Sequence, residues 1–326
     1  MTRTMKIGII TPAPPGSVYG NRVTALRWAK ILRKLGHQVS IAAKCDGEPF
    51  DFLIALHARR SHSSIDRWRR KHPAAPLVVA LTGTDLYRDL QSHRHARESL
   101  QLADKIVVLQ PRALKLLTPA LRNKARVIYQ SVEARTSTNS ARFKSPLGTF
   151  DVCVIGHLRA VKDPLRAALA SRLLPPASQV RVLHMGRALT AAFADRARRE
   201  MKINPRYRWL GELPRARALR TLAGGNLFVI SSRMEGGANV LSEAIVAGIP
   251  VLASRIDGNV GILGTDYPGL FRVGATRELA RLMTRAETDP KFLSRLKTRV
   301  TKLAPLFHPL REERAWADLI DELISD

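Results

Sequence analysis

Short apolar runs alternate with helix-like segments along almost the whole of this 326-residue chain. The runs are continuously hydrophobic, which is typical of strands buried on both faces of a parallel sheet. In the first part of the chain the candidate strands are residues 6–11, 39–43, 52–56, 77–81, 105–109 and 127–129. In the second part they are residues 151–155, 179–185, 207–210, 226–231, 250–253 and 270–273. The alternation predicts an α/β fold of two doubly wound, Rossmann-like domains.

A break in this alternation marks the expected domain boundary. Residues 134–148 begin with a polar stretch and read as a linker. We therefore expect an N-terminal domain over residues 1–146 and a second domain over residues 147–307. Doubly wound sheets bind ligands at the carboxyl ends of their strands, so the loops after the strands are where functional residues are expected.

The composition excludes several classes of protein. The two cysteines, Cys45 and Cys153, form no CxxC pair and no metal-ligand spacing, which excludes a disulfide scaffold and a structural zinc module. The most membrane-like stretch, residues 244–254, is too short to cross a bilayer. The apolar run at residues 7–10 is too brief for a signal peptide. We expect a soluble, cytoplasmic protein without stable membrane insertion.

The chain is strongly basic, with 54 Lys and Arg against 27 Asp and Glu and a net charge of +27. Such a charge raises the hypothesis of nucleic-acid binding, because phosphate contacts dominate that affinity. The basic residues are nevertheless spread along the chain. The local clusters at residues 67–71 and 196–199 lie in helix-like segments, where a solvated face is the simpler interpretation. We expect no nucleic-acid partner and a general attraction of anionic ligands.

Several catalytic motifs are absent from the sequence. It contains no GxGxxG after the first strand, no GxxxxGK(S/T), no HExxH and no GxSxG, which disfavours a dehydrogenase, a P-loop enzyme, a zincin and a serine hydrolase. No two aspartates are separated by a single residue, so the Asp-x-Asp arrangement that holds a divalent metal on a nucleotide diphosphate is missing too. We expect no metal and no cofactor, and we expect any phosphate to be bound by backbone amides and basic side chains.

The loop after the first run is rich in proline and glycine. It spans residues 11–20 and leads into a helix that opens at Asn21 and Arg22. Prolines stiffen such a loop, while Gly16 and Gly20 let a ligand approach the backbone closely. Asn21 is a favourable N-cap, and free amides at a helix start attract anions. A tight strand-to-helix connection needs the same residue types, so this segment alone leaves both interpretations open.

A second loop carries a more specific pattern. Residues 232–243 place Glu235 in the loop and Glu243 about two turns into the next helix, with Gly236 and Gly237 between them. Amides at a helix N-terminus suit a diphosphate, and carboxylates on either side of it suit sugar hydroxyls. The alternative is that Glu235 caps the helix and Glu243 lies on a solvated face, which its apolar neighbours disfavour.

A third loop follows the strand at residues 151–155 and contains Gly156, His157, Arg159 and Lys162. Arg159 and Lys162 lie between the end of a strand and the next helix, where they could neutralise a leaving diphosphate.

Together these three loops resemble the GT-B glycosyltransferases, in particular the large retaining family that uses nucleotide sugars without a metal, the family 4-like type. The resemblance spans nearly the whole chain, and its most specific part is the E-x7-E spacing from Glu235 to Glu243. It implies that Glu243 binds the donor ribose, that Glu235 faces the donor sugar and that Lys162 binds the diphosphate. It also implies that a C-terminal helix, residues 308–326, returns to the N-terminal domain and that the two domains face a cleft.

The resemblance assigns a role to further residues. The catalytic residues are expected to be Lys162, Arg159 and Glu235. The donor-binding residues are expected to be Gly16, His157, Gly236, Gly237, Ala238, Asn239, Val240 and Glu243.

Three positions depart from the family pattern. His157 stands where the family usually has Arg, so Arg159 is expected to substitute for it. Residues 82–85, Thr-Gly-Thr-Asp, replace a His-Gly element, and residues 260–261 lie where a Glu often follows a glycine. These changes concern the acceptor side of the reaction.

Three N-terminal segments, residues 11–17, 20–28 and 81–90, resemble a narrower group, the selenosugar synthases of selenoneine biosynthesis. Those enzymes join selenium from selenophosphate to the sugar of a UDP-sugar. A small trianionic acceptor needs cations, and an activated selenium nucleophile needs no strong general base. The acceptor-binding residues are expected to be Asn21, Arg22, Thr82, Asp85 and Arg88, with Arg59 and Arg60 nearby. Each of these arginines could instead belong to the general surface surplus.

The leading hypothesis is therefore a selenosugar synthase that takes the sugar of a UDP-sugar, expected to be UDP-N-acetylglucosamine, and selenophosphate, forms a C–Se bond and releases UDP. A functional link to other selenium-pathway enzymes would follow. The alternative within the same family is a conventional glycosyltransferase with a sugar, lipid or polysaccharide acceptor at a membrane surface, for which the basic-aromatic cluster near Trp68 is the candidate docking helix. A non-catalytic nucleic-acid binder would leave the E-x7-E spacing unexplained.

Overall fold

The structure is a computed structural model that describes residues 4–17, 19–133 and 148–325. It separates into two compact units. The first contains Met1–Ser131, Glu235–Ala238 and His308–Asp326, and the second contains Val132–Met234 and Asn239–Phe307. The expected linker, apart from Gly148, and the expected boundary at residues 146 and 147 lie outside the described residues.

The first unit is built on a parallel six-stranded sheet with the strand order β2-β1-β3-β4-β5-β6 among the described residues. Its strands are β1 (Lys6–Ile10), β2 (Gln38–Ala42), β3 (Phe52–Leu56), β4 (Leu77–Leu81), β5 (Lys105–Val108) and β6 (Ala125–Val127). Its helices are α1 (Gly20–Lys34), α2 (His62–Lys71), α3 (Leu90–Ser92), α4 (Arg94–Leu102), α5 (Pro119–Asn123) and α13 (Pro309–Ser325). A π-helical turn (Asp85–Asp89) and a 3₁₀ segment (Pro111–Leu116) complete it. The order reverses between β1 and β3, which is the switch point of a flavodoxin-like sheet.

The second unit has its own parallel six-stranded sheet, ordered β9-β8-β7-β10-β11-β12. Its strands are β7 (Phe150–Ile155), β8 (Val180–Met185), β9 (Tyr207–Trp209), β10 (Leu227–Ile230), β11 (Val251–Ser254) and β12 (Leu270–Phe271). Its helices are α6 (Arg166–Ser171), α7 (Ala191–Ile203), α8 (Arg215–Gly224), α9 (Asn239–Val246), α10 (Asp257–Leu263), α11 (Thr276–Thr288) and α12 (Pro290–Leu303), with 3₁₀ turns at Ala160–Lys162 and Ala304–Phe307. This order is that of a dinucleotide-binding sheet, with the switch point between β7 and β10.

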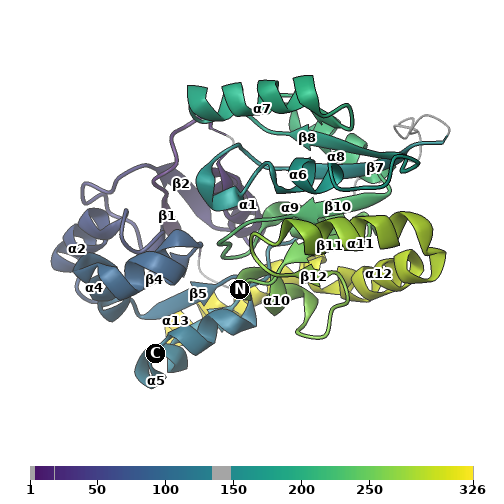
Figure 1. The fold of residues 1–326 in the computed structure, drawn as a ribbon. Coiled ribbons are helices and arrows are strands. Elements are labelled where there is room, and N and C mark those ends of the chain that lie inside the picture. The colour runs from purple at the N-terminus through teal and green to yellow at the C-terminus, as the bar shows by residue number, and fades with distance from the viewer. Residues whose placement is uncertain (1–3, 18, 134–147, 326) are drawn as a thin grey trace. The chain divides into compact units, whose positions relative to one another are not determined.

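Both sheets are buried between helices, as Figure 1 shows. In the first unit β3 and β4 are buried at every position. One core cluster, which includes Trp28 and Trp316, covers one face of the sheet, and another, which includes Trp68, covers the other. The continuous hydrophobicity of the runs is explained by this two-sided burial. The predicted α/β fold class with two doubly wound domains is confirmed.

Two local expectations were wrong. Helix α1 begins at Gly20, and the N-cap residue is Tyr19 without a side-chain cap bond, so Asn21 lies inside the first turn rather than capping it. The sixth strand ends at Val127 instead of beginning there, because Ala125–Val127 pairs in register with Ile106–Val108 of β5.

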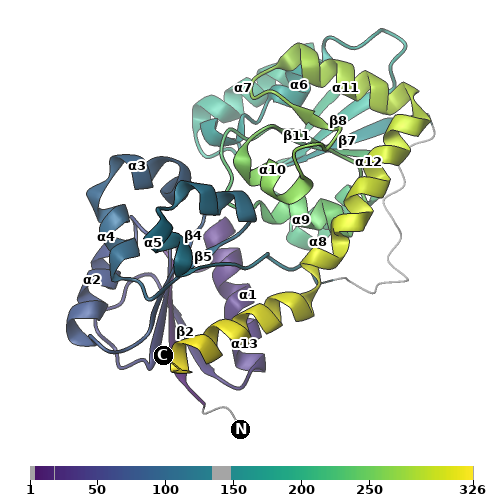
Figure 2. The same cartoon turned by 90° about the horizontal axis from the view of Figure 1, so that it is seen from below.

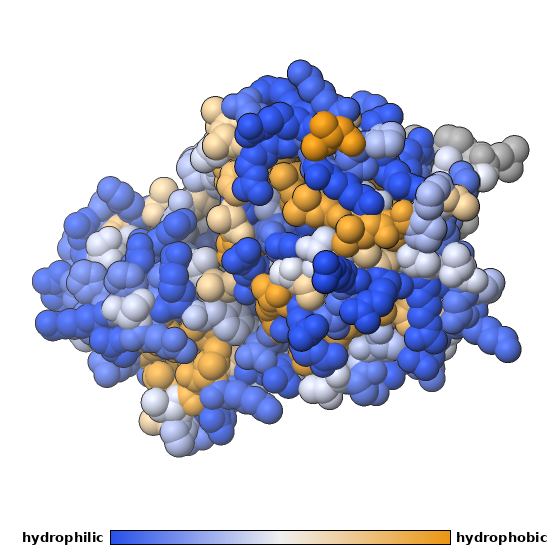
Figure 3. Space-filling model, in the orientation of Figure 1, coloured by the Kyte–Doolittle hydropathy of each residue, from blue (hydrophilic) through white to orange (hydrophobic). Residues whose placement is uncertain are grey.

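The described residues contain no helix that is long and apolar enough to cross a membrane. In the view of Figure 3 hydrophilic residues cover most of the visible surface. The basic-aromatic cluster is part of α2, but Trp68 is fully buried in the core of the first unit. Its arginines are paired, with Arg69 bound to Asp104 and Arg70 bound to Asp66. This helix therefore offers no exposed aromatic side chain for insertion into lipid.

The C-terminal helix α13 belongs to the first unit and packs against α1, as Figure 2 shows. Its Glu312 side chain has no solvent exposure. The carboxylate accepts hydrogen bonds from the Trp28 indole at 2.8 Å and the Ser131 backbone amide at 2.7 Å, and it pairs with Arg27 at 3.0 Å. One buried carboxylate thus ties α13 to α1 and to the segment after β6.

We predict that Glu312→Ala destabilises the first unit by about 3–5 kcal/mol, because it removes the acceptor of the buried Trp28 indole N–H and of the Ser131 amide and the ion-pair partner of the partly buried Arg27. The neighbouring Glu313 pairs with Lys34 at the surface, and Glu313→Ala is the matched control, expected to cost about 0–1 kcal/mol. Urea unfolding followed by tryptophan fluorescence measures both. Equal effects of the two variants would contradict the anchoring role of Glu312.

Candidate active site

The loops after β7 and β10 meet at the switch point of the second sheet. The backbone amide of Arg233 donates to the carbonyl of Val161 at 2.8 Å. The hydroxyl of Ser231 donates to the carbonyl of Asp163 at 2.9 Å. The second and third loops singled out in the sequence are therefore neighbours, at the position where such sheets bind nucleotides.

The loop after β7 carries His157, Arg159 and Lys162. The Nδ1 atom of His157 accepts a hydrogen bond from the backbone amide of Arg187 at 3.3 Å, and burial lowers the pKa of this imidazole. His157 is therefore neutral at neutral pH, so a cation at this place must come from another residue. Arg159 is exposed and Lys162 is half-buried in the 3₁₀ turn that follows.

The loop after β10 leads directly into α9, which begins at Asn239, so Glu243 lies about one turn into the helix instead of the two turns expected from the sequence. Gly236, Gly237 and Ala238 immediately precede the helix, and Val240 lies in its first turn. The first amides of a helix have no intrahelical partner, so this turn presents donors suited to a phosphate. Glu235 at the start of the segment is 9% exposed.

Glu243 lies in the interior of α9 and is buried, with 7% exposure. Its carboxylate forms an ion pair with Arg215, the first residue of α8, at 2.6 Å. The prediction that Glu243 avoids a solvated face is confirmed. Its pairing with Arg215 was missed, because the two residues are far apart in the sequence and no motif links them.

A buried histidine supports the loop after β7. His184 on β8 donates through Nε2 to the Gly156 carbonyl at 3.2 Å, so in its neutral form Nδ1 accepts from the Tyr207 hydroxyl at 2.9 Å. Gly186 packs so closely that an added Cβ would lie 2.0 Å from the Gly156 oxygen. Complete burial lowers the pKa of His184 to about 4. The position of Gly156 is thus held from β8 and β9.

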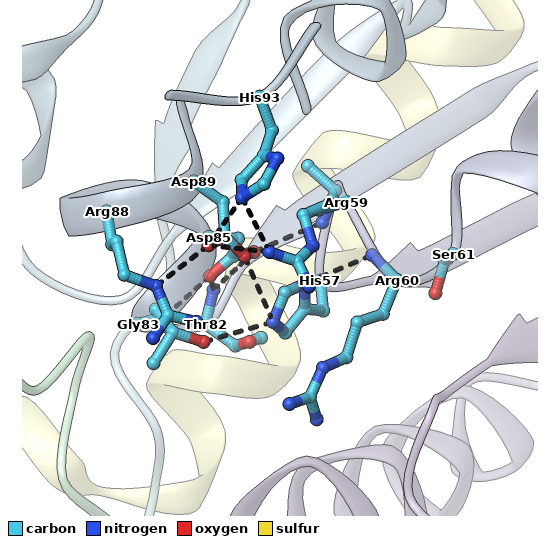
Figure 4. A network of polar contacts seen from close by, with 12 residues as sticks. His57, Arg59, Arg60, Ser61, Thr82, Gly83, Asp85, Arg88, Asp89 and His93 are labelled. Carbon is cyan, nitrogen blue, oxygen red and sulfur yellow. Dashed lines mark hydrogen bonds and ion pairs between the residues drawn. The ribbon is translucent and has the colours of Figure 1, made fainter. Parts of the chain in front are cut away.

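In the first unit, loops after β3 and β4 form a second group of predicted residues, shown in Figure 4. Asp85 is fully buried, and its carboxylate accepts backbone N–H bonds from Ala58, Thr82 and Gly83 at 2.8–3.2 Å. Both oxygens are engaged with the backbone. This differs from the acceptor contact expected of Asp85, and we assign it the role of holding the ends of β3 and β4 together.

Next to Asp85 lies a network of polar side chains, of which the sequence analysis identified only some members. Asp89 is fully buried, and its Oδ1 accepts from Arg88 Nε at 3.0 Å and from Arg59 Nη1 at 3.3 Å. His57 contacts Thr84 through Nε2 at 3.0 Å, and burial lowers its pKa, with Asp85 acting in the opposite direction. Arg59 and Arg88 were singled out in the sequence. Asp89 and His57 were not, because their burial and the contact of Asp89 with Arg59 arise only in the folded structure.

The remaining predicted residues lie after β1. Gly16 adopts a left-handed conformation with φ of 73°, which accounts for a glycine in this loop. Asn21 and Arg22 lie in the first turn of α1, and among the described residues no hydrogen bond or ion pair joins them to the network of Figure 4. Arg22 Nε is buried and has no acceptor within the described part of the chain.

One set of side chains in the described ranges lies at metal-ligating distance, although no metal was expected. The ligand atoms of His62 on α2 and of His95 and Glu98 on α4 lie within 4.8 Å of one another. The two imidazoles stack at 4.4 Å, and Glu98 pairs with Arg94 at 2.5 Å. The carboxylate is therefore already neutralised by an arginine.

Comparison with known proteins identifies the family. Residues 136–303, just over half of the chain, match the group 1 glycosyl transferases, and the chain belongs to this family. Glycosyltransferase 1 domain-containing protein 1 of Xenopus tropicalis is 23% identical over 318 residues, which are 90% of this chain and 92% of that protein.

Solved structures share the fold over the full length. HepE of Anabaena, crystallised with UDP and glucose, has a TM-score of 0.75 at 16% identity and covers 98% of this chain and 100% of its own. Sucrose-phosphate synthase of Thermosynechococcus elongatus has a TM-score of 0.79 at 15% identity and covers 99% of this chain and 100% of its own. The fold is therefore the GT-B fold expected from the sequence.

The pKa of His184 leads to a pH prediction. In the unfolded chain its pKa returns to about 6.5, so between pH 6.5 and about 4 the unfolded state takes up a proton that the folded state does not. The contribution of His184 to stability is complete above pH 6.5 and is lost towards pH 4, by at most about 1.4 kcal/mol per pH unit. We expect His184→Gln to unfold with a shallower pH dependence than the wild type in urea titrations between pH 7 and 5. Parallel pH profiles would contradict the assignment.

Proposed function

We propose that the chain is a selenosugar synthase, which transfers the sugar of a UDP-sugar, UDP-N-acetylglucosamine, to the selenium of selenophosphate and releases UDP. Membership of the group 1 glycosyl transferases supports sugar transfer. HepE structures contain UDP and UDP-glucose, and a related pneumococcal O-GlcNAc transferase was solved with UDP and GlcNAc, which supports UDP as the leaving group.

The observation that carries the donor side is the meeting of the β7 and β10 loops at the switch point of the second sheet. Lys162 and Arg159 supply positive charge there, and the first turn of α9 supplies backbone amides for the diphosphate. Glu243 supplies a buried acceptor for the ribose hydroxyls, and Arg215 holds its carboxylate before the nucleotide binds. Glu235 is assigned to the donor sugar.

The proposed step is a displacement at the anomeric carbon. A lone pair of selenium forms the C–Se bond while the bond from C1 to the UDP oxygen breaks, and its electron pair remains on the β-phosphate. Lys162 and Arg159 neutralise the charge that develops on this leaving group. The phosphoryl group stays on selenium. The nucleophile is already anionic, so the step needs no strong general base, in keeping with the replacement of the His-Gly element by residues 82–85.

The acceptor side rests on the resemblance of the N-terminal motifs and on the basic loops after β3 and β4. Arg59, Arg60 and Arg88 give these loops the charge that a small anionic acceptor needs. A lipid acceptor at a membrane surface was suggested by a candidate docking helix near Trp68. Because Trp68 is buried, this helix does not support a lipid acceptor.

We expect UDP release from UDP-N-acetylglucosamine to depend on selenophosphate and to continue in EDTA, since the proposed site neutralises the diphosphate with side chains and amides. Coupled detection of UDP measures the rate, and mass spectrometry identifies the selenium-containing sugar. Turnover with a sugar or lipid acceptor but none with selenophosphate would overturn the acceptor and leave sugar transfer intact. Abolition by EDTA would overturn the metal-free site.

We expect Glu243→Gln to weaken UDP binding by about tenfold or more, because a hydrogen bond to a charged group contributes about 1.5–3 kcal/mol. Glu278→Gln is the matched control, since Glu278 also pairs with an arginine, Arg272, but lies on the surface of the second unit. Isothermal titration with UDP measures both variants. An unchanged affinity of Glu243→Gln would refute the ribose assignment.

A further inference from the structure

Asp89 is an unusual residue of the first unit, because it is a fully buried carboxylate with one unused oxygen. It is the last residue of the π-helical turn Asp85–Asp89. Such turns are rare in proteins overall, and those that occur are often found at functional sites. Its Oδ1 receives both Arg59 and Arg88, whereas its Oδ2 has no hydrogen-bond partner among the described residues. His57 Nε2 is 3.9 Å from Oδ2, which is beyond hydrogen-bonding distance.

The two arginines that Asp89 holds keep one side exposed. The side chain of Arg59 is 34% exposed and that of Arg88 is 56% exposed, although both contact a carboxylate that is 1% exposed. His93 Nε2 accepts a second bond from Arg59 Nη1 at 2.7 Å, so this guanidinium is held from two sides. A guanidinium has five N–H donors, and the contacts with Asp89 and His93 use only some of them.

A third arginine adds charge to the same loop. The guanidinium of Arg60 makes no hydrogen bond or ion pair within the described ranges, and Figure 4 shows it extending away from the two aspartates. Three arginines against Asp85 and Asp89 leave an excess of one positive charge, and the Asp85 carboxylate is bound to backbone amides instead of the arginines. A net positive charge with exposed guanidinium donors complements a phosphoryl oxyanion.

His57 prepares a neutral donor beside these cations. Its Nδ1 accepts from the Arg60 backbone amide, which places the proton of the neutral ring on Nε2 and makes Thr84 Oγ1 the acceptor. The proton of the Thr84 hydroxyl then has no acceptor among the described residues. His57 also has a positive φ of 73°, a strained conformation for a residue other than glycine. Strain of this kind persists where the surrounding contacts fix the loop.

We infer that Arg59, Arg88 and the Thr84 hydroxyl bind the phosphoryl oxygens of the acceptor, and that Asp89 is the positioning residue that holds the two arginines. The inference rests on the proposed function and names the residues that its acceptor would meet. The loops concerned follow β3 and β4, next to the switch point between β1 and β3. Ligands of such sheets bind at these carboxyl ends.

Inorganic phosphate is the probe for this site, because it carries the phosphoryl oxygens without selenium chemistry. Isothermal titration of the full chain with phosphate, carried out with UDP saturating the diphosphate site, compares the wild type with Arg88→Gln and Asp89→Asn. We expect both variants to weaken phosphate binding at least tenfold and to keep the wild-type affinity for UDP. In selenophosphate turnover we expect them to raise KM for selenophosphate more than they lower kcat. A wild-type urea midpoint of the first unit, followed by the fluorescence of its buried Trp28, Trp68 and Trp316, shows that a variant is folded.

Arg94→Gln is the matched control, since Arg94 is an exposed arginine of the same unit that pairs with Glu98 outside this network. It is expected to bind phosphate like the wild type. Equal losses of phosphate affinity in all three variants would assign the effect to general charge and overturn the inference. Unchanged phosphate affinity in Arg88→Gln would overturn it too, because this substitution removes an exposed side chain and does not threaten folding. If the variants lose phosphate affinity as expected but the wild type shows no turnover with selenophosphate, the oxyanion site is supported and the proposed reaction is refuted.

Discussion

The burial of parallel strands on both faces is the constraint on which the rest of the structure depends. Every side chain of β3 and β4 is buried, so side chains that contact a ligand can lie only where these strands end. All polar side chains assigned to function therefore come from the loops after strands and from the helices that begin there. The order of the strands then decides which loops are neighbours: β7 with β10 in the second sheet, and β1 with β3 in the first.

Three buried carboxylates connect separate segments of this basic chain. Glu312 ties helix α13 to α1, Asp85 joins the ends of β3 and β4, and Asp89 gathers two arginines. Each is buried and has several donors, which is the condition under which a charge can leave water at an acceptable cost in free energy. Many of the basic side chains behind the net charge of +27 are exposed at the surface. The basic side chains assigned to the proposed sites are few, and buried carboxylates hold Arg59, Arg88 and Arg215 in place.

Sequence reasoning was accurate for features that depend on local pattern. The strand runs, the helix that starts just after Gly236 and Gly237, and the burial of Glu243 all follow from apolar spacing along one segment. It was less accurate at element ends, where hydrogen bonding decides. The helix α1 starts at Gly20 without a side-chain cap, so the favourable capping chemistry of Asn21 is not used.

The sequence by itself determined the two α/β domains, the absence of an Asp-x-Asp motif and the loops in which a phosphate-binding site should be sought. Only the tertiary structure decided which side chains meet in those loops. Arg59 reaches Asp89 and Arg215 reaches Glu243 across separate loops, and Asp85, expected to touch a ligand, holds backbone amides instead. The physical reason is that the position of a loop depends on strand order and register, which cannot be read from the spacing of residues within one segment. The burial of a strand or of a helix face can be predicted from the apolar pattern of that segment alone.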